Sequence, residues 1–236
     1  MYEMVNTVPF TAVEPDGKLK LHEAVGLMAN CCQFQEYVEQ DFRKFLVDNN
    51  IAVFLFSLQL DIFRMPEFRE NITTAVKIYG CKSIYGLRQL TIRDADGKLC
   101  MIANATGAFF DLQAGKAIKL EPEKLNVKFD APEEMECLPR KITIPESEVV
   151  KHPSFTVKPS HLDLNGHMTT PVYFSIATDV LPEQFEYNRV RIEFKQQAKT
   201  GDIIYPETRQ SDGKYIVELK SDGILSNAVL EFSKRS

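Results

Sequence analysis

Three side chains of different chemistry lie at alternate positions in the second half of the chain. Asp163, Asn165 and His167 offer a carboxylate, a carboxamide and an imidazole. Alternate side chains of an extended backbone point the same way, so these three can converge on one small volume. An imidazole titrates close to neutral pH and can take a proton from water, and a neighbouring carboxylate can orient it. The spacing therefore indicates acid–base chemistry centred on His167.

The same segment has a purely structural interpretation. Asp and Asn ahead of a helix commonly cap it or form a turn, and a single His is often only a partly buried polar group. The apolar segment 171–181 predicts such a helix, with Pro171 in its first turn. N–H groups at the helix start, including those of Gly166 and His167, can stabilise negative charge on an oxygen atom. Spacing alone leaves both interpretations open.

The first half of the chain has the pattern of a helix followed by antiparallel strands. Apolar residues recur at three- and four-residue steps over 21–45, which is typical of a helix. Strand-like runs follow at 72–79, 85–93 and 99–112, and the turn at 94–97 joins the last two. Such an order is an α+β pattern, in which the strands can wrap around the helix and bury it.

Apolar and polar residues alternate over 52–62, which predicts a long strand with one buried face. The even-numbered residues are apolar and form the predicted buried face: Phe54, Phe56, Leu58, Leu60 and Ile62. The odd-numbered polar residues form the other face: Ser57, Gln59 and Asp61. The apolar face either packs the core or lines a tunnel for an apolar ligand.

Residues 126–150 differ from the rest, because prolines are spread among charged residues with little periodicity. This composition is typical of a linker. After it a helix, 171–181, again precedes strands, which we expect at 188–198, 214–220 and 224–233, with turns at 211–213 and 221–223. The repeated order predicts an N-terminal unit over 1–125 and a C-terminal unit over 151–236.

Composition and charge exclude several classes of function. The chain has 236 residues and a net charge of −5, without a run of Lys and Arg, which argues against nucleic-acid binding. We expect no membrane span and no secretory signal, because the apolar runs are short and no basic segment opens the sequence. The cysteines are odd in number, and no two of them form a C-x-x-C motif. We therefore expect buried reduced thiols and a cytoplasmic location.

Other catalytic motifs do not occur. The sequence contains no G-x-S-x-G, no P-loop and no dinucleotide-binding glycine motif. The four histidines, His22, His152, His161 and His167, lack zinc-ligand spacing with cysteine. We therefore expect neither a cofactor nor a metal.

The segment Asp163-Leu164-Asn165-Gly166-His167-Met168 resembles the motif that begins the C-terminal helix of the acyl-acyl-carrier-protein thioesterases, the Fat-type enzymes of plants and their bacterial relatives. Val172-Tyr173 stands where that family has a Lys-Tyr or similar pair. The first half, from Ala52 through Met65-Pro66 to Gly97, resembles the N-terminal unit of the family. The resemblance covers most of the chain.

This resemblance implies a tandem, or double, hotdog fold of the α+β class, in which each unit is a long helix wrapped by an antiparallel sheet. It also implies that the N-terminal unit houses the acyl chain and the C-terminal unit supplies the catalytic groups. The activity would be hydrolysis of the thioester of fatty acyl-acyl-carrier protein, or of acyl-coenzyme A, to release a free fatty acid. A homodimer is a further possibility.

The sequence departs from the family at one functional position. A Glu-Cys pair on the strand after the helix belongs to the family's active site, whereas Gln197 and Ala198 stand there in this chain. Gln197 can hold a water molecule but cannot take its proton. Strand alternation also places Gln196, not Gln197, on the face of Val190 and Ile192, so bringing Gln197 into the site requires a bulge or twist.

We assign roles to these residues as hypotheses. His167 acts as general base, and Asp163 orients His167 or Asn165; Asp163 is the alternative base. Asn165 with the helix-start N–H groups binds the oxyanion. Two other functions compete, a hotdog 3-hydroxyacyl-thioester dehydratase and a weakly catalytic or non-catalytic acyl-thioester binding protein. The alternating cations Arg189, Arg191, Lys195 and Lys199 either meet an acidic carrier protein or form a solvated strand face.

Overall fold

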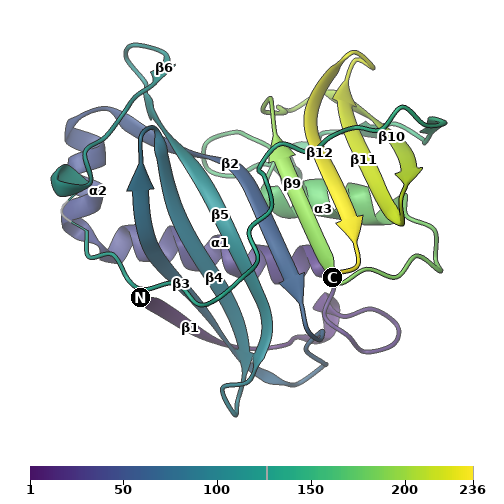
Figure 1. Cartoon of the computed structure of the whole chain (residues 1–236), viewed down its shortest axis with the longest axis horizontal. Helices are drawn as coiled ribbons and strands as arrows, with labels where there is room; N and C mark the ends of the chain where they lie inside the picture. The colour runs from purple at the N-terminus through teal and green to yellow at the C-terminus, as the bar shows by residue number, and fades with distance from the viewer. Residues whose placement is uncertain (126, 236) are drawn as a thin grey trace. The chain divides into compact units, whose positions relative to one another are not determined.

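A computed structural model of the chain describes residues 1–125 and 127–235, so Asn126, the first residue of the predicted linker, lies outside it. The chain forms two compact units (Figure 1). The first unit comprises Met1–Lys20 and Leu27–Cys137. The second comprises Leu21–Gly26 and the chain from Leu138 to its C-terminal end. The change from one unit to the next therefore falls inside the predicted linker.

The first unit pairs helices with an antiparallel sheet whose strand order is β1-β3-β4-β5-β2. Its strands are β1 (Tyr2–Thr7), β2 (Ile51–Ile62), β3 (Asn71–Lys82), β4 (Tyr85–Asp94), β5 (Leu99–Asp111) and the short β6 (Lys116–Ala117), which pairs with β5. Short 3-10 turns lie at Phe10–Ala12 and Pro122–Leu125. The predicted hairpin between β4 and β5 is confirmed, with Gly97 in the left-handed region at φ 78°.

The predicted helix over 21–45 is two helices, α1 (Leu21–Val38) and α2 (Gln40–Asp48). They are separated at Glu39, whose ψ of 69° is not helical. The apolar repeat continues across this break because α2 buries its own face, with Phe42 and Leu46 packed against Phe109. Sequence periodicity therefore predicted a single long helix where the structure has two shorter ones.

The predicted face of the long strand β2 is wrong. A bulge lies between Leu55 and Ser57, so that Phe56 is an extra residue opposite β5. Since side chains alternate, the bulge turns Phe54 and Phe56 to the side opposite Leu58. Residues 57–62 are buried on both faces, including the polar side chains predicted to be exposed.

The linker explains why polar residues on β2 and its neighbours are buried. The Gln89 side chain donates to the Glu133 carbonyl at 3.0 Å and accepts from the Glu133 N–H at 2.6 Å. Gln59 donates to the Glu136 carbonyl at 2.6 Å, and Asn104 donates to the Cys137 sulfur at 3.1 Å. The first part of the linker thus lies on the face of the sheet opposite α1 (Figure 1).

The second unit repeats the plan with one helix, α3 (Thr170–Asp179), and an antiparallel sheet of order β9-β12-β11-β10-β7. Its strands are β7 (Val150–Lys151), β8 (Phe155–Thr156), β9 (Arg189–Phe194), β10 (Ile203–Ser211), β11 (Lys214–Ser221) and β12 (Leu225–Ser233). The short β8 also pairs with β10, and a 3-10 turn spans Pro159–His161. Pro171 lies in the first turn of α3, as predicted. Strand β10 was not predicted, and β9 ends four residues before the predicted limit of 198.

Both hairpin turns of the second unit are confirmed. The turn between β10 and β11 has positive φ at Asp212 and Gly213, and the turn between β11 and β12 has it at Asp222 and Gly223. Two consecutive left-handed residues match the right-handed twist of the flanking strands. Asp and Gly are the residues that adopt this conformation at lowest cost.

The predicted row of four cations on β9 is not formed. Arg189 and Arg191 are only 3% and 7% exposed, so neither faces solvent. Arg191 forms an ion pair with Glu231 at 2.8 Å and donates to the carbonyls of Pro139 and Lys141 in the linker. Both interpretations of this row, a docking surface and a solvated face, are therefore wrong for these two residues.

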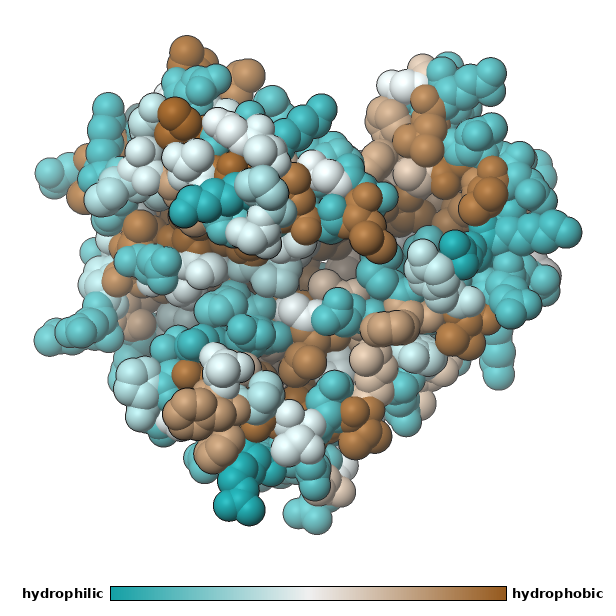
Figure 2. All heavy atoms as spheres, turned by 180° about the vertical axis from the view of Figure 1, so that it is seen from behind, coloured by the Kyte–Doolittle hydropathy of each residue, from teal (hydrophilic) through white to brown (hydrophobic). Residues whose placement is uncertain are grey.

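The surface mixes apolar and hydrophilic residues over the face shown in Figure 2. Among the helices of the described residues, none is both long enough and apolar enough to cross a membrane. The five cysteines are free thiols. Only Cys31 and Cys100 are buried, while Cys32 and Cys81 are partly exposed and Cys137 is exposed, which corrects the expectation of buried thiols.

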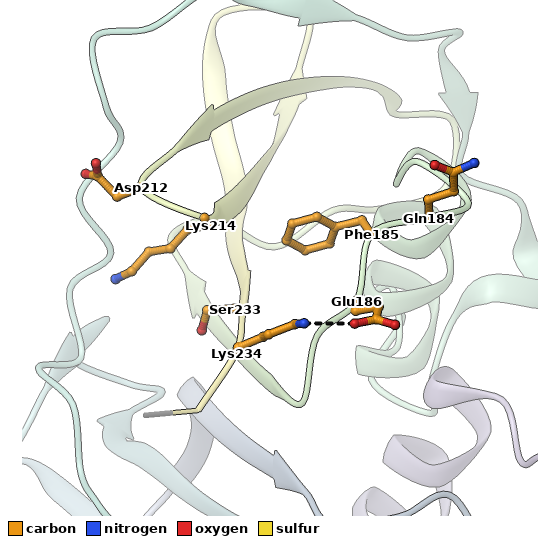
Figure 3. Close-up of a pocket in the computed structure, with 8 residues that line it drawn as sticks. Gln184, Phe185, Glu186, Asp212, Lys214, Ser233 and Lys234 are labelled. Carbon is orange, nitrogen blue, oxygen red and sulfur yellow. Dashed lines mark hydrogen bonds and ion pairs between the residues drawn. The ribbon is translucent and has the colours of Figure 1, made fainter.

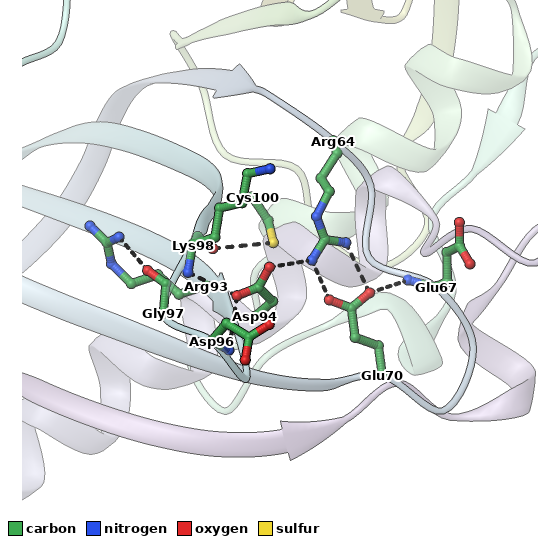
Figure 4. A network of polar contacts seen from close by, with 9 residues as sticks. All are labelled: Arg64, Glu67, Glu70, Arg93, Asp94, Asp96, Gly97, Lys98 and Cys100. Atoms are coloured by element: carbon green, nitrogen blue, oxygen red, sulfur yellow. Dashed lines mark hydrogen bonds and ion pairs between the residues drawn. The ribbon is translucent and has the colours of Figure 1, made fainter.

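An ionic network joins the segment after β2 to the β4–β5 hairpin (Figure 4). The Arg64 guanidinium donates to both carboxylate oxygens of Glu70 and to Asp94 at 2.9 Å. These bonds hold the pKa of both carboxyl groups below the ordinary range. Glu70, Asp94 and Cys100 have ligand atoms within 4.8 Å of one another, but Arg64 already supplies the positive charge there.

This network predicts a pH-dependent contribution to stability. Replacing Arg64 by Met should lower the free energy of unfolding at pH 7 by about 0.5–1 kcal/mol, chiefly through the partly exposed pair with Glu70. Glu70 and Asp94 both lose a charged donor. Since their folded pKa values are depressed, the advantage of the wild type is complete above about pH 5 and shrinks as pH falls through the ordinary carboxyl range near 4. Urea unfolding of both proteins from pH 7 to pH 3 measures it. A difference that stays constant with pH would contradict the assignment.

Candidate active site

The predicted motif forms a closed loop directly before α3. Leu162 and Met168 pair as an antiparallel bridge, and the Asp163 N–H donates to the His167 carbonyl at 2.9 Å. At the tip, Leu164 is fully exposed, and Gly166 has a φ of 74°, which favours glycine. The loop thus reverses the chain and delivers Met168 to the start of the helix.

The Asp163 carboxylate stabilises this loop from within. Its Oδ1 accepts the backbone N–H of Asn165 at 2.8 Å and that of His167 at 3.1 Å. This is the turn-forming behaviour expected of Asp, and it fixes the backbone that carries Asn165 and His167. The structural and the functional interpretation of the motif are therefore compatible, because the turn that Asp163 stabilises carries both Asn165 and His167.

The predicted oxyanion donors are already engaged in this loop. The Gly166 N–H donates to the Asp163 carbonyl at 3.0 Å, and the His167 N–H donates to Asp163 Oδ1. An oxyanion would have to share or replace these bonds. The assignment of Gly166 and His167 as backbone donors stays a prediction.

The chain after β9 contains the bulge that the functional interpretation of Gln197 requires. The consecutive N–H groups of Lys195 and Gln196 both donate to the Asn227 carbonyl, at 2.8 and 3.1 Å. Two donors on one carbonyl break the regular ladder and shift the alternation of side chains beyond them. Gln197 can therefore lie on the face of Val190 and Ile192, which regular alternation would give to Gln196.

Asn227 supports this bulge, and sequence analysis missed it. Its side chain is fully buried, accepts the Ser221 hydroxyl at 2.6 Å, and donates to the Gln196 carbonyl at 3.5 Å. The available signal was an amide side chain ahead of the apolar run of β12, where a polar group needs hydrogen-bond partners.

Ala198 connects the bulged segment to both the motif and the helix. Its carbonyl accepts the Met168 N–H at 2.9 Å, and its own N–H donates to the Tyr173 hydroxyl at 3.2 Å. Tyr173 lies on α3, packs edge-on against Phe194 at 5.3 Å, and is buried. Burial raises the pKa of Tyr173 to about 12, so its hydroxyl stays neutral.

The predicted site residues therefore gather on two neighbouring segments of the second unit. His167 and Gln197 immediately precede Met168 and Ala198, the two residues joined by a backbone hydrogen bond. His167 is half-buried, whereas Asp163, Asn165 and Gln197 are exposed. The arrangement places an imidazole and an amide beside a tight, hydrogen-bonded loop at a helix start.

A separate cavity of about 440 Å³ lies at the other end of β9 (Figure 3). It is lined by Gln184, Phe185 and Glu186 before β9, by the turn between β10 and β11, and by Ser233 and Lys234. Lys234 forms an ion pair with Glu186 at 2.8 Å, and both side chains are well exposed. Because Gln197 follows the opposite end of the strand, this cavity is not part of the candidate site.

Comparison with known protein families gives two matches that together cover most of the chain. The acyl-ACP thioesterase N-terminal domain matches residues 1–127, and the acyl-ACP thioesterase C-terminal domain matches residues 145–232. No curated protein matches the sequence.

Solved structures with similar folds come from bacteria and a plant. An acyl-ACP thioesterase from Bacteroides thetaiotaomicron has a TM-score of 0.88 at 19% identity, over 98% of this chain and 96% of its own. A putative oleoyl thioesterase from Lactobacillus plantarum has a TM-score of 0.84 at 17% identity, over 100% and 97%. The 12:0-ACP thioesterase from Umbellularia californica has a TM-score of 0.81 at 11% identity, over 99% and 96%. At these identities the likeness concerns the fold, and it confirms the double hotdog.

The hydrogen bond between Tyr173 and Ala198 yields a prediction. Tyr173→Phe keeps the ring against Phe194 but leaves a buried N–H without its acceptor, which should cost about 1–2 kcal/mol of stability. Hydrogen exchange at the Ala198 amide should accelerate by about tenfold or more, as followed by NMR. Tyr205→Phe, at an exposed position of β10, is the control and should change neither quantity. Unchanged exchange at Ala198 in Tyr173→Phe would contradict the role of the hydroxyl.

Proposed function

We propose, since the chain belongs to the family of acyl-ACP thioesterases, that the loop of Asp163, Asn165 and His167, together with Gln197, is its active site. The chain is a thioester hydrolase that releases fatty acid from acyl-ACP. One observation carries the assignment of the site. The bond from the Met168 N–H to the Ala198 carbonyl joins the motif to the segment where the family has its second pair of active-site residues.

His167 is the proposed general base. A thioester carbonyl is already reactive, so the protein must position it, stabilise the oxyanion and activate water. The imidazole is half-buried, and its unprotonated ring nitrogen can take a proton from water. Gln197 cannot take that proton, but its amide can hold the water by hydrogen bonds.

Asp163 acts chiefly through the backbone in this proposal. Its Oδ1 holds the N–H groups of both residues that carry the other functional side chains, Asn165 and His167. A loop held in this way keeps an imidazole and an amide in place before substrate arrives, which lowers the cost of reaching the transition state. Asn165 is the proposed side-chain donor to the oxyanion.

The two units have different proposed tasks. The N-terminal unit takes the acyl chain, and the C-terminal unit cleaves the thioester. Acyl-coenzyme A is a proposed alternative to acyl-ACP, because it presents the same bond to be broken. A homodimer and a cytoplasmic location are further proposals that rest on the resemblance and the composition.

Substitution of the motif residues tests the active site. His167→Ala should lower kcat on acyl-ACP by about 100- to 10,000-fold, because the base is lost. Asp163→Asn should lower kcat by a smaller factor of about 10–100, because a neutral oxygen binds the two N–H groups less strongly. Release of free thiol, assayed with acyl-ACP and with acyl-coenzyme A, measures both.

His152→Ala serves as the matched control. His152 belongs to the same unit, and its Nε2 forms a hydrogen bond with the Thr208 hydroxyl at 2.8 Å. Neither residue is part of the motif or of the bulged segment. Substitution of His152 should leave kcat within about twofold, since it loses one hydrogen bond that contributes only to stability. Turnover near the wild-type value in both motif variants would remove these assignments.

Restoring the family's carboxylate gives a second test. Gln197→Glu should raise kcat by about 10- to 100-fold, because the new side chain can accept the proton that Gln197 cannot. The gain should be lost as pH falls through the ordinary carboxyl range near 4. Gln196→Glu is the control, because it adds the same charge at the preceding residue, which is also exposed, and it should not raise kcat. Equal rates in both variants would argue that Gln197 does not face the substrate.

A further inference from the structure

One face of the sheet in the first unit contains polar groups where an apolar core is expected. This inner face is defined by cross-strand partners on β3, β4, β5 and β2: Thr74, Val76, Ile78, Arg88, Leu90, Ile92, Met101, Ala103, Ala105, Leu58, Leu60 and Ile62. It is the side of α1, because Arg88 contacts Glu36 of that helix, whereas Gln89 and Asn104 on the opposite side bind the linker. Figure 1 shows α1 and the linker on opposite sides of this sheet.

Arg88 is the charged residue of the inner face. Its guanidinium lies 3.7 Å from Glu36 Oε2, and the side chain is only 16% exposed. It also interacts with the thiol of Cys32, whose pKa is raised by burial. Directly across from Arg88 on β5 is Ala105, whose side chain is small and offers the guanidinium no polar partner.

Gln35 adds an unpartnered polar group on the same side. It lies on the stripe of α1 that faces the sheet, one turn after the buried Cys31, and is 2% exposed. Its Oε1 has no hydrogen-bond partner among the described residues. Gln35 adjoins Glu36 and follows Cys32 by three positions, and both of those residues interact with Arg88. A buried polar atom without a partner lowers stability, so Gln35 Oε1 needs a hydrogen-bond donor that the described residues do not supply, which points to a ligand.

We propose that the interior of this unit recognises a hydroxyl group carried on the acyl chain, bound by the Gln35 amide and the Arg88 guanidinium. The inference rests on the proposed function, in which this unit takes the acyl chain. A hydroxyl both donates and accepts, so it can pair with Gln35 Oε1 and with an Arg88 N–H at once. Glu36 balances the charge of Arg88, which favours a neutral polar group over a second carboxylate.

A matched substrate series tests the proposal. For one chain length that the wild type hydrolyses, kcat/KM is compared between the saturated acyl-ACP, its positional hydroxy isomers and the corresponding keto compounds. At least one hydroxy isomer should exceed the saturated chain by about tenfold, since a buried polar group then gains its partner. In Gln35→Leu that ratio should fall to about one. Gln35→Met, which keeps the unbranched shape, should behave in the same way.

The control and a second readout separate recognition from folding. Gln33→Leu makes the same change at an exposed position of α1 and should keep the wild-type ratio. Gln35→Leu should raise Tm by about 2–4 °C, because it removes a buried polar atom without a partner. Higher stability with lost selectivity is the signature of a residue retained for binding.

Three results would overturn the inference. They are equal hydrolysis of saturated and hydroxylated chains by the wild type, a preference for keto compounds alone, and an unchanged ratio in both Gln35 variants. Absence of hydrolysis for every acyl thioester would instead contradict the proposed function. In that case calorimetry would measure the Kd of hydroxylated and saturated chains for the wild type and for Gln35→Leu. The ratio of the two Kd values would then take the place of the kcat/KM ratio.

Discussion

The candidate site depends on the two hydrogen bonds made by the backbone of Ala198. One holds the motif through Met168, and the other holds α3 through the buried hydroxyl of Tyr173. In a regular strand the N–H and carbonyl of a residue bond to neighbouring strands. Ala198 can instead bind the motif and α3, because the ladder of β9 ends at the bulge opposite Asn227. The irregularity is therefore what allows a loop, a helix and a strand end to meet in one place.

The parts of the structure that follow from short-range rules could be predicted from the sequence. The helix starting near Pro171 and the turns containing Gly97 and Gly213 depend on neighbouring residues only, and all are confirmed. The motif could be singled out because three chemistries fall at alternate positions. Its closure depends on Asp163 binding nearby N–H groups, which is likewise a local effect.

The predictions that failed depended on partners distant in the chain. An extra residue in β2 reverses its alternation, and nothing near Phe56 in the sequence marks the bulge. Strand β10 was missed because it contains Pro206 and a buried Glu207, which is neutralised by Lys220 of β11. Arg191 looked like a surface cation until its partner Glu231, forty residues away, was known. Spacing does not reveal such pairs.

The segment between the units has a consequence for how such a chain can vary. A spacer that only connects two bodies tolerates insertions and deletions at almost any point. Here the backbone N–H and carbonyl of Glu133 are both bound by the Gln89 side chain, and the Ile142 N–H donates to the Glu193 carboxylate at 3.0 Å. These positions are therefore held in register with a strand. A length change at either position would shift every later bond by one residue. Homologues should therefore differ in length where no strand side chain grips the backbone, and keep their spacing where one does.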